Sequence, residues 1–478
     1  MSILYPEFTA NLSPARRIYI SGMEKKGAGG DRAHFIGIGG VSMSALAMFY
    51  KAAGFEVSGS DISEGAFTEA LRENGVEVAI GHSAENVRDC GVVIKNAAIS
   101  GENPELAAAV ERGIPVKDRS EVLGEIAAAH KYCIAVAGSH GKTTCGGMLA
   151  NIFMTAGMDP SAHIGGVMLN TGSQYVIGGG EYFITEACEY KRGFLHIKPD
   201  VAVVLNVAMD HPDCYKDIGD ISCAFFEFIS GVKEGGAAVL NGDDETLRLS
   251  AQMPLPVRQN FFGLEGHNEY RAANIAQAGG RYSFGIVERG ESLCRVSLKI
   301  LGKHNIYNAL AACAAARQYG ISPGDIKAGL EGFAGMRRRF EYWGRVNGAE
   351  VYHDYAHHPQ EIAATVLAAR QALPHGRMIC VFQPHTYTRT QKLFDKFVDA
   401  LQGADVNILA EIYPAREKPI DGVTGGALKD ALLLKGNKAY ACADFPAVCG
   451  KIKELAREGD VALILGAGDI DKLKELLF

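Results

Sequence analysis

Short apolar runs alternate with helix-like segments along almost the whole chain. Runs such as AHFIGI (33–38), YCIAVAG (132–138) and DVALILGAG (460–468) end at glycine or polar residues. Between such runs, apolar residues recur at helical spacing, as in SMSALAMFYKAAG (42–54). Buried strands separated by helices are typical of parallel sheets, so the alternation predicts an α/β fold.

The chain has 478 residues, which is too long for one ordinary core and predicts roughly three domains. We expect domain boundaries near residues 122 and 334. The predicted units are an N-terminal extension (1–30), a Rossmann-like domain (31–122), a central nucleotide-binding domain with a mostly parallel sheet (123–334) and a C-terminal Rossmann-like α/β domain (335–478).

Charge and cysteine usage exclude several classes of function. The net charge is −7 and no basic run stands out, which argues against nucleic-acid and membrane-surface partners. The longest apolar run, VAVVLNVAM (201–209), is too short to span a membrane. The eleven cysteines form no CxxC pair, so we expect reduced thiols in a cytoplasmic protein. The sequence leaves the oligomeric state, monomer or homodimer, open.

A glycine-rich turn follows the first predicted strand. In HFIGIGGVSM, Gly37, Gly39 and Gly40 let the backbone approach a diphosphate at a helix N-terminus. Asp61 follows the next strand, where an acid that binds a ribose would lie. The third fingerprint position is Ser42, so the signal is weak alone. A nicotinamide or flavin site and a tight turn without a ligand both stay open.

A second glycine-rich turn, AGSHGKTT, resembles a phosphate loop with altered spacing. The usual first glycine is replaced by Val136, and Gly138 and Gly141 lie closer together. Lys142 can reach terminal phosphates, and the hydroxyl of Thr143 is placed to hold Mg²⁺. The alternative, an ordinary turn with a surface lysine, requires Gly-Lys-Thr-Thr to be a coincidence.

This spacing resembles the short phosphate loop of the Mur ligases, the ATP-dependent enzymes that form amides in peptidoglycan precursor synthesis. The resemblance extends over most of the chain through HFIGIGG, VSGSD, GSHGKTT, GKHNIYNAL, RRRFEYWG, DYAHHPQEI, FQPHTYTRT, IYPAREKPI and LGAGDI. It implies a central P-loop ATPase domain, ATP as a substrate and Mg²⁺. DYAHHPQEI and FQPHTYTRT resemble the branch that joins L-alanine to the lactyl carboxylate of UDP-N-acetylmuramate through an acyl phosphate.

The resemblance also implies a role for each matched position. ATP-binding residues would be Gly138, Ser139, His140, Gly141, Lys142, Thr143, Thr144, His304, Asn305, Arg339 and Asp354. UDP-sugar-binding residues would be Gly37, Gly39, Gly40, Ser60 and Asp61. Amino-acid-binding residues would be Tyr355, His357, His358, His385 and Arg389. The metal ligands would be Thr143, Glu186 and His211, and the catalytic residues Lys142, Glu186, His211, Arg339, His358 and Arg389.

Acidic residues follow two strands of the central block. Glu186 and Glu189 end one strand, and Asp210 and His211 follow the next, so both pairs should emerge at the sheet edge that carries the phosphate loop. Carboxylate oxygens suit Mg²⁺, whereas a histidine ligand is unusual for it. Cys188 replaces an acid that the family commonly has. The alternative is that these residues are strand-end caps.

The residues of GKHN (302–305) and the three arginines at 337–339 also have simpler explanations. Asn305 alone reads as a helix N-cap, and three consecutive arginines are usually a solvated face. A guanidinium from another domain, Arg339, could instead stabilise transition-state charge.

In the third block, Arg389 could bind the carboxylate of the amino acid bidentately. His358 or His385 could remove the ammonium proton. A zinc site at the His357–His358 pair is the alternative, although its spacing is not a familiar zinc signature.

Four other functions stay open. Within the class, the acceptor could be glycine, serine or a peptide, or the chain could be a folate polyglutamate ligase, which should lack FQPHTYTRT. A nicotinamide-dependent oxidoreductase would use the first glycine turn but leaves GSHGKTT unexplained. A nucleotide-regulated binding protein without catalysis would not need Lys142, Glu186 and His211 together.

Overall fold

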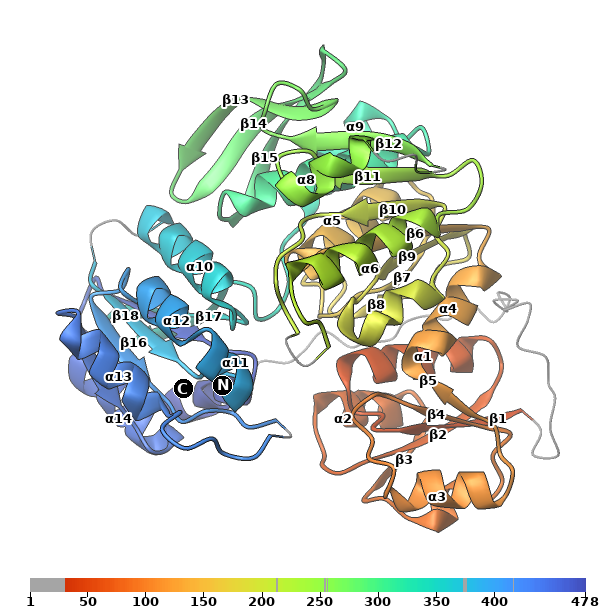
Figure 1. The fold of residues 1–478 in the computed structure, drawn as a ribbon, viewed down its shortest axis with the longest axis horizontal. Helices are drawn as coiled ribbons and strands as arrows, with labels where there is room; N and C mark the ends of the chain where they lie inside the picture. The colour runs from red at the N-terminus through yellow and green to blue at the C-terminus, as the bar shows by residue number, and fades with distance from the viewer. Residues whose placement is uncertain (1–30, 212–213, 253–254, 256, 373–375, 416) are drawn as a thin grey trace.

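The computed structural model describes residues 31–211, 214–252, 255, 257–372, 376–415 and 417–478. The predicted extension, 1–30, lies outside these residues. The described residues form three sheets, each covered by helices, in three successive domains (Figure 1). The predicted α/β class with three domains is therefore confirmed. Among the described residues, no helix has both the length and the apolar character that a membrane span needs.

The first domain has a parallel sheet with the strand order β3-β2-β1-β4-β5. This is the order of a Rossmann half, and it places the turn after β1 at the centre of the sheet edge. The strands are β1 (Arg32–Ile36), β2 (Glu56–Asp61), β3 (Glu77–Ile80), β4 (Val92–Lys95) and β5 (Val116–Asp118). The helices are α1 (Val41–Ala52), α2 (Ala66–Glu73), η1 (Ala84–Val87), α3 (Pro104–Glu111) and α4 (Arg119–Ala129).

The central sheet has the order β15-β14-β13-β12-β11-β10-β6-β9-β7-β8. It is parallel from β13 to β7 and antiparallel at both ends. Its first strands are β6 (Tyr132–Ala137), β7 (Ser161–His163), β8 (Tyr175–Val176), β9 (Tyr182–Glu186) and β10 (Val201–Val204). The others are β11 (Ala237–Asn241), β12 (Arg258–Gly263), β13 (Tyr270–Ala278), β14 (Arg281–Glu288) and β15 (Glu291–Leu301).

Two helices anchor the phosphate loop of this domain in its core. Helix α5 (Lys142–Thr155) begins directly after the loop, and α8 (His304–Arg317) packs beside it. The alanines of α8 from Ala309 to Ala316 are fully buried, and their small size lets the helix lie close to α5 and the sheet. The remaining helices are η2 (Tyr190–His196), α6 (Ile218–Ser230), α7 (Glu245–Arg248), η3 (Leu249–Gln252) and α9 (Pro323–Gly332).

The third sheet has the order β16-β17-β21-β18-β19-β20 and is parallel except for the edge strand β16. Its strands are β16 (Glu341–Val346), β17 (Ala349–Asp354), β18 (Met378–Phe382), β19 (Val406–Leu409), β20 (Lys438–Ala441) and β21 (Val461–Leu465). The helices are α10 (Pro359–Ala372), α11 (Tyr387–Lys392), α12 (Phe394–Leu401), α13 (Gly425–Leu434), α14 (Phe445–Leu455), η4 (Ile470–Lys472) and α15 (Leu473–Leu477).

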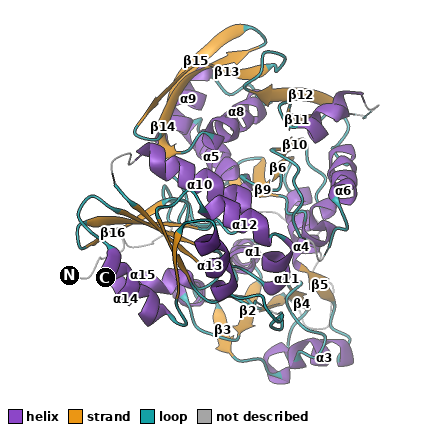
Figure 2. Cartoon of the chain, turned by 60° about the vertical axis from the view of Figure 1, so that its left-hand side comes forward, coloured by secondary structure: helices purple, strands orange, loops and turns teal. Residues whose placement is uncertain are grey.

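Helix α10 lies between the third sheet and the central domain (Figures 1 and 2). Its far end contacts the β13–β15 extension, where the Tyr282 hydroxyl donates to Gln371 Oε1 at 2.9 Å. The predicted boundary at 334 lies between α9 and β16, and that at 122 falls inside α4, which contacts elements of both domains. These boundaries stay predictions.

Candidate active site

The phosphate loop connects β6 to α5, and its glycines have conformations that other residues rarely adopt. The φ angles of Gly138 and Gly141 are +136° and +89°. A Cβ at Gly141 would lie 2.6 Å from Asn308 Oδ1, so the loop has no room for a side chain there. Asn206, on the neighbouring strand's loop, accepts from the His140 amide at 2.8 Å. Glycine and asparagine together fix the loop.

The side chain of Lys142 turns back over this loop. Its Nζ donates to the Gly138 carbonyl at 2.5 Å and lies 3.0 Å from a carboxylate oxygen of Glu189, which is fully buried. Burial disfavours the charged amine, but the nearby carboxylates, Glu189 foremost, raise the pKa of Lys142 above its ordinary value. The lysine is thus charged and close to where terminal phosphates would bind.

Beside Lys142, three side chains form a cluster that could hold a cation. The ligand atoms of Glu189, Asp210 and His211 lie within 4.8 Å of one another. They follow β9 and β10, which flank β6 in the sheet. His211 has a φ of +51°, a strained conformation that often marks a functional position. Two carboxylates suit a hard cation such as Mg²⁺.

The other predicted metal ligands lie together at a second position. The Thr143 hydroxyl donates to Glu186 Oε2 at 3.2 Å, and the Gly165 amide donates to the other carboxylate oxygen. Burial raises the pKa of Glu186 above its ordinary value. The structure therefore pairs Thr143 with Glu186, and His211 with the acids Glu189 and Asp210. Their joint action on one metal ion stays a prediction.

A cavity of about 410 Å³ opens next to the loop, between the central and C-terminal domains. This volume suits a nucleotide-sized ligand. Seven of the residues predicted to bind ATP line it: His140, Gly141, Thr144, His304, Asn305, Arg339 and Asp354. The other four, Gly138, Ser139, Lys142 and Thr143, belong to the adjoining loop and helix start.

The residues predicted to bind the amino acid lie on the C-terminal side of the same interface. Arg389 Nη2 lies 3.1 Å from Asp210 Oδ1 of the central domain, and Arg389 Nη1 lies 3.3 Å from His385 Nδ1. The His385 ring is 5.7 Å from the His357 ring, which is 5.4 Å from the Tyr355 ring. Four of the five predicted residues thus form one cluster around a guanidinium that already binds a carboxylate.

Comparisons with known proteins decide the family. Residues 32–131 match "Mur ligase family, catalytic domain", 136–316 match "Mur ligase middle domain" and 338–468 match "Mur ligase, glutamate ligase domain". A UDP-N-acetylmuramate–L-alanine ligase of Clostridium beijerinckii is 42% identical over 438 residues, which cover 91% of this chain and 95% of the relative. The chain belongs to the Mur ligase family.

Further relatives of this Mur ligase agree. A UDP-N-acetylmuramate–L-alanine ligase of Acetivibrio thermocellus is 42% identical over 93% of the chain and 94% of its own length. The crystal structure of UDP-N-acetylmuramate-alanine ligase MurC from Thermotoga maritima has a TM-score of 0.80 and 28% identity, and covers 93% of this chain and 98% of its own. A murein peptide ligase of Psychrobacter arcticus, with a TM-score of 0.72 and 24% identity, shares the fold over 94% and 98% of the two chains.

Four residues that line the cavity of this Mur ligase were not predicted from the sequence. Asn241, Asp243, Asp244 and Tyr307 line the cavity, and the Tyr307 hydroxyl donates to Asp243 Oδ2 at 3.0 Å. The signal was available, because NGDD follows the apolar run of β11 and β11 is parallel to β10. Polar residues after a parallel strand lie at the ligand-binding edge of the sheet.

Arg339 reaches the cavity from the connection to the C-terminal domain, and Asp354 reaches it from the end of β17. The guanidinium of Arg339 lies 5.3 Å from the Tyr355 ring, within range of a cation–π contact. Asp354 accepts hydrogen bonds at 2.8 Å from the amides of Phe340 and Ala356, and burial raises its pKa. Asp354 therefore holds the connecting segment in place as well as lining the cavity.

His358, the fifth residue predicted to bind the amino acid, lies against the phosphate loop. Its ring is 5.1 Å from the ring of His140. Burial, followed by the charge of His140, lowers the pKa of His358 to about 4. Its Nε2 is buried and has no hydrogen-bond partner among the described residues. The low pKa keeps the imidazole neutral but also makes it a weak base, so the role of His358 as a proton acceptor stays a prediction.

In the first domain, the predicted sugar-binding residues form the expected turn. Two of them, Ser60 and Asp61, make hydrogen bonds within the domain. The Gly39 amide donates to Asp61 Oδ2 at 2.9 Å, and the Gly37 amide donates to the Ser60 carbonyl at 2.8 Å. The Ser60 hydroxyl is buried and donates to Glu105 at 2.6 Å. Gly40 is the N-cap of α1. Direct contact of Ser60 and Asp61 with a ligand stays a prediction.

Proposed function

We propose that this Mur ligase uses ATP to join L-alanine to the lactyl carboxylate of UDP-N-acetylmuramate, in peptidoglycan precursor synthesis. The observation that carries the proposal is a single interface that brings together the phosphate loop, a nucleotide-sized cavity and the Arg389 cluster. The named relatives from Clostridium and Acetivibrio support the same substrates, because they match over nearly their whole length.

The chemistry follows from the poor reactivity of a carboxylate. Transfer of the γ-phosphoryl group of ATP to the lactyl carboxylate gives an acyl phosphate and ADP. The neutral amine of alanine then attacks the acyl carbon, and the tetrahedral intermediate releases inorganic phosphate as the amide forms. Negative charge builds up on the transferred phosphoryl group in the first step, and on the acyl oxygen and the departing phosphate in the second, so fixed cations stabilise both transition states.

The chain's own residues divide this work. Lys142 and Arg339 bind the phosphates, since both border the phosphate-loop end of the interface. Arg389 binds the carboxylate of alanine, for which Asp210 is the internal stand-in. His358 is assigned to receive a proton from the ammonium group, because its ring lies beside that of His140 in the phosphate loop and its Nε2 has no partner among the described residues.

The acidic side chains fit a divalent cation. Glu189, Asp210 and His211 would hold Mg²⁺ in one group, and Thr143 with Glu186 in a second. When bound, the cation neutralises phosphate charge. We further propose a cytoplasmic enzyme, because none of the eleven cysteines, all of which lie in the described residues, is in a disulfide bond.

Binding of the UDP-sugar is assigned to the first domain. The turn formed by Gly37, Gly39 and Gly40 precedes α1, where the amides of the first helical turn and the helix dipole favour a diphosphate. The first domain also contacts the central one here, because Ser42 Oγ lies 2.8 Å from His163 Nε2. The sugar's carboxylate would extend from this turn toward the phosphate loop.

The test is ADP formation with ATP, Mg²⁺, UDP-N-acetylmuramate and each proteinogenic amino acid in turn, with mass spectrometry of the product. Selective turnover with alanine and a product that gains one alanyl residue is expected. Equal turnover with glycine or serine would move the proposal to a broader amino-acid ligase. Absence of ADP formation with any amino acid, but absorbance change with a nicotinamide cofactor, would overturn it.

A further inference from the structure

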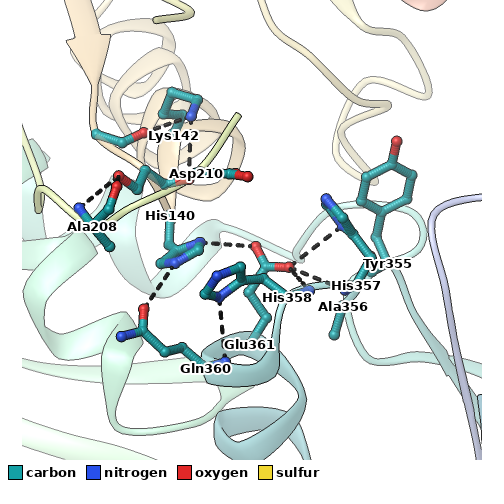
Figure 3. Close-up of polar contacts among 12 residues, drawn as sticks. His140, Lys142, Ala208, Asp210, Tyr355, Ala356, His357, His358, Gln360 and Glu361 are labelled. Atoms are coloured by element: carbon teal, nitrogen blue, oxygen red, sulfur yellow. Dashed lines mark hydrogen bonds and ion pairs between the residues drawn. The ribbon is translucent and has the colours of Figure 1, made fainter. Parts of the chain in front are cut away.

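Glu361 occupies an unusual position at the interface of the central and C-terminal domains. It lies in the first turn of α10, and its side chain is only 13% exposed. Figure 3 shows its carboxylate between the ring of His140, from the phosphate loop, and the segment that carries Tyr355, His357 and His358. The sequence alone assigns it no role.

The two oxygens of this carboxylate bind different domains. Oε1 lies 3.1 Å from His140 Nδ1 in the phosphate loop. Oε2 accepts from the amides of His357 at 3.1 Å and His358 at 3.3 Å. One side chain therefore connects the phosphate loop with the segment that carries Tyr355, His357 and His358 (Figure 3).

Further contacts fix the position of His140 between the phosphate loop and α10. Its amide donates to Asn206 Oδ1 at 2.8 Å, and its carbonyl accepts from Asn206 Nδ2 at 3.0 Å. The remaining ring nitrogen, Nε2, lies 3.1 Å from Gln360 Oε1 on α10. A displacement of α10 would therefore change the position of the phosphate loop at His140.

Electrostatics strengthen the link. Burial disfavours the charged carboxylate of Glu361, but His357 and His140, followed by Arg339, hold its pKa well below the usual range. Hydrogen bonds to a charged group are stronger than neutral ones, and the buried surroundings weaken solvent screening.

We propose that Glu361 is a positioning residue that assembles the phosphate loop and the amino-acid site as one unit. The proposal rests on the ligase function proposed above. When the C-terminal domain docks, Glu361 fixes His140 and the segment of His357 and His358 in the same event. The acyl phosphate then forms only where the amine can reach it.

Without the contacts of Glu361, we expect hydrolysis of the acyl phosphate. If ATP phosphorylates the lactyl carboxylate while the segment of His357 and His358 is misplaced, water attacks the acyl carbon. The bond from the acyl carbon to the phosphate oxygen breaks, the carboxylate and inorganic phosphate are released, and the surplus proton goes to solvent. ADP then accumulates without amide.

A purely local role for Glu361 is the competing explanation, because its contacts to the His357 and His358 amides also cap α10. Glu361→Gln distinguishes the two. The amide can still accept from a backbone N–H, so a cap survives in large part, but the charged contact to His140 is lost.

The experiment measures ADP formed per amide formed, and the KM for alanine, in full-length variants. Glu361→Gln should raise the ratio from one to several and raise the KM for alanine about tenfold. His140→Gln should act in the same way, and the double variant should add little to either single change. The matched control is Glu454→Gln, an exposed glutamate paired with Lys451 on α14, which should match the wild type.

Several outcomes would overturn the proposal. An unchanged ratio and an unchanged KM for alanine in Glu361→Gln would leave only the local role. If Glu361→Gln fails to fold, His140→Gln carries the same test from the other side of the contact. The wild-type enzyme is assayed first, because a lack of alanine-dependent ADP formation there would contradict the proposed function and not the role of Glu361.

Discussion

Arg389 of the C-terminal domain and Asp210 of the central domain form an ion pair across the interface, with Nη2 and Oδ1 3.1 Å apart. Both side chains are 9% exposed. Burial disfavours the charge of Asp210, but His211 and Arg389 hold its pKa below the usual range. A charged carboxylate is therefore already paired with the guanidinium to which we assign the binding of alanine. Alanine binding would exchange one carboxylate partner of Arg389 for another. The buried guanidinium would therefore have a partner both with and without alanine.

Arg389→Lys should raise the KM for alanine by roughly one to two orders of magnitude, because a single ammonium cannot bind a carboxylate bidentately. The KM for ATP should change little, since Arg389 does not line the nucleotide cavity. Steady-state kinetics of ADP formation check both values. Arg345→Lys, in an exposed pair with Glu350, is the matched control. Equal increases in both KM values would assign Arg389 to domain docking instead.

Glu189→Gln should raise the Mg²⁺ concentration needed for half-maximal rate by about tenfold, because the cluster with Asp210 and His211 loses a charged ligand. Titration of Mg²⁺ at saturating ATP measures the effect, and a chelator should abolish activity in the wild type. Glu181→Gln, an exposed acid paired with Lys131, serves as the control. A normal Mg²⁺ requirement in Glu189→Gln would favour Thr143 and Glu186 as the metal site.

Local patterns were sufficient to predict the central parallel strands of each sheet, but not flanking parallel strands such as β3, β5 and β12. Buried strands such as β6, β10 and β21 are short apolar runs that end at glycine or polar residues, and their pattern needs no knowledge of neighbouring strands. The phosphate loop is similar, because a strand, two glycines, lysine and threonine lie within a few consecutive residues. These features were confirmed, with strand ends that differ from the apolar runs by one or more residues.

The antiparallel extension β13–β15 was not predicted. Its strands are partly exposed, so they lack the continuous apolar runs that revealed the parallel strands. The hairpin turns did leave a signal. Gly279 and Gly280 separate β13 from β14, and Arg289 and Gly290 separate β14 from β15, all with positive φ angles.

Contacts between domains could not be read from the sequence. Glu361 lies 221 residues after His140, and Arg389 lies 179 residues after Asp210. Neither pair follows from periodicity or from a local motif, because both depend on how the C-terminal domain docks. Glu189 is a different case, because it lies in the same domain as Lys142: the family pattern assigns the metal to Glu186, whereas the Glu189 carboxylate is the one that pairs with Lys142.

His163→Gln should make stability less sensitive to mild acid. His163 is buried between the first and central domains, with Nε2 2.8 Å from Ser42 Oγ and Nδ1 3.3 Å from Thr185 Oγ1. Burial, followed by the charge of Arg119, lowers the pKa of His163 to about 3. The unfolded chain binds a proton near pH 6.5 and the folded chain does not, so stability falls as pH decreases from about 6.5 toward 3.

The measurement is the free energy of unfolding by urea as a function of pH. Below pH 6.5 the wild type should lose up to about 1.4 kcal/mol per pH unit from this group, and His163→Gln should lack that contribution. Glutamine can still bond Ser42, so the two proteins are comparable near pH 7.5. Other buried histidines titrate in both proteins and cancel in the difference. Parallel pH profiles would show that His163 is not held neutral.

Lys142→Ala should cost both activity and stability, for different reasons. Loss of the cation should lower the rate of ADP formation by about three orders of magnitude. It also leaves the fully buried Glu189 carboxylate without its partner, which should destabilise the protein by roughly 3–5 kcal/mol. Urea unfolding of the ligand-free enzyme measures the second effect separately from the first.

The double variant Lys142→Ala with Glu189→Gln separates the two roles. Removing the charge of Glu189 eliminates the unpaired carboxylate, so stability should recover in large part while activity stays lost. Lys131→Ala is the control, because its pair with Glu181 has both side chains 57% exposed, and exposed pairs contribute at most about 1 kcal/mol. If Lys142→Ala unfolded at the same urea concentration as Lys131→Ala, Lys142 would not be the counter-charge of Glu189. Full activity in Lys142→Ala would remove it from the phosphate site as well.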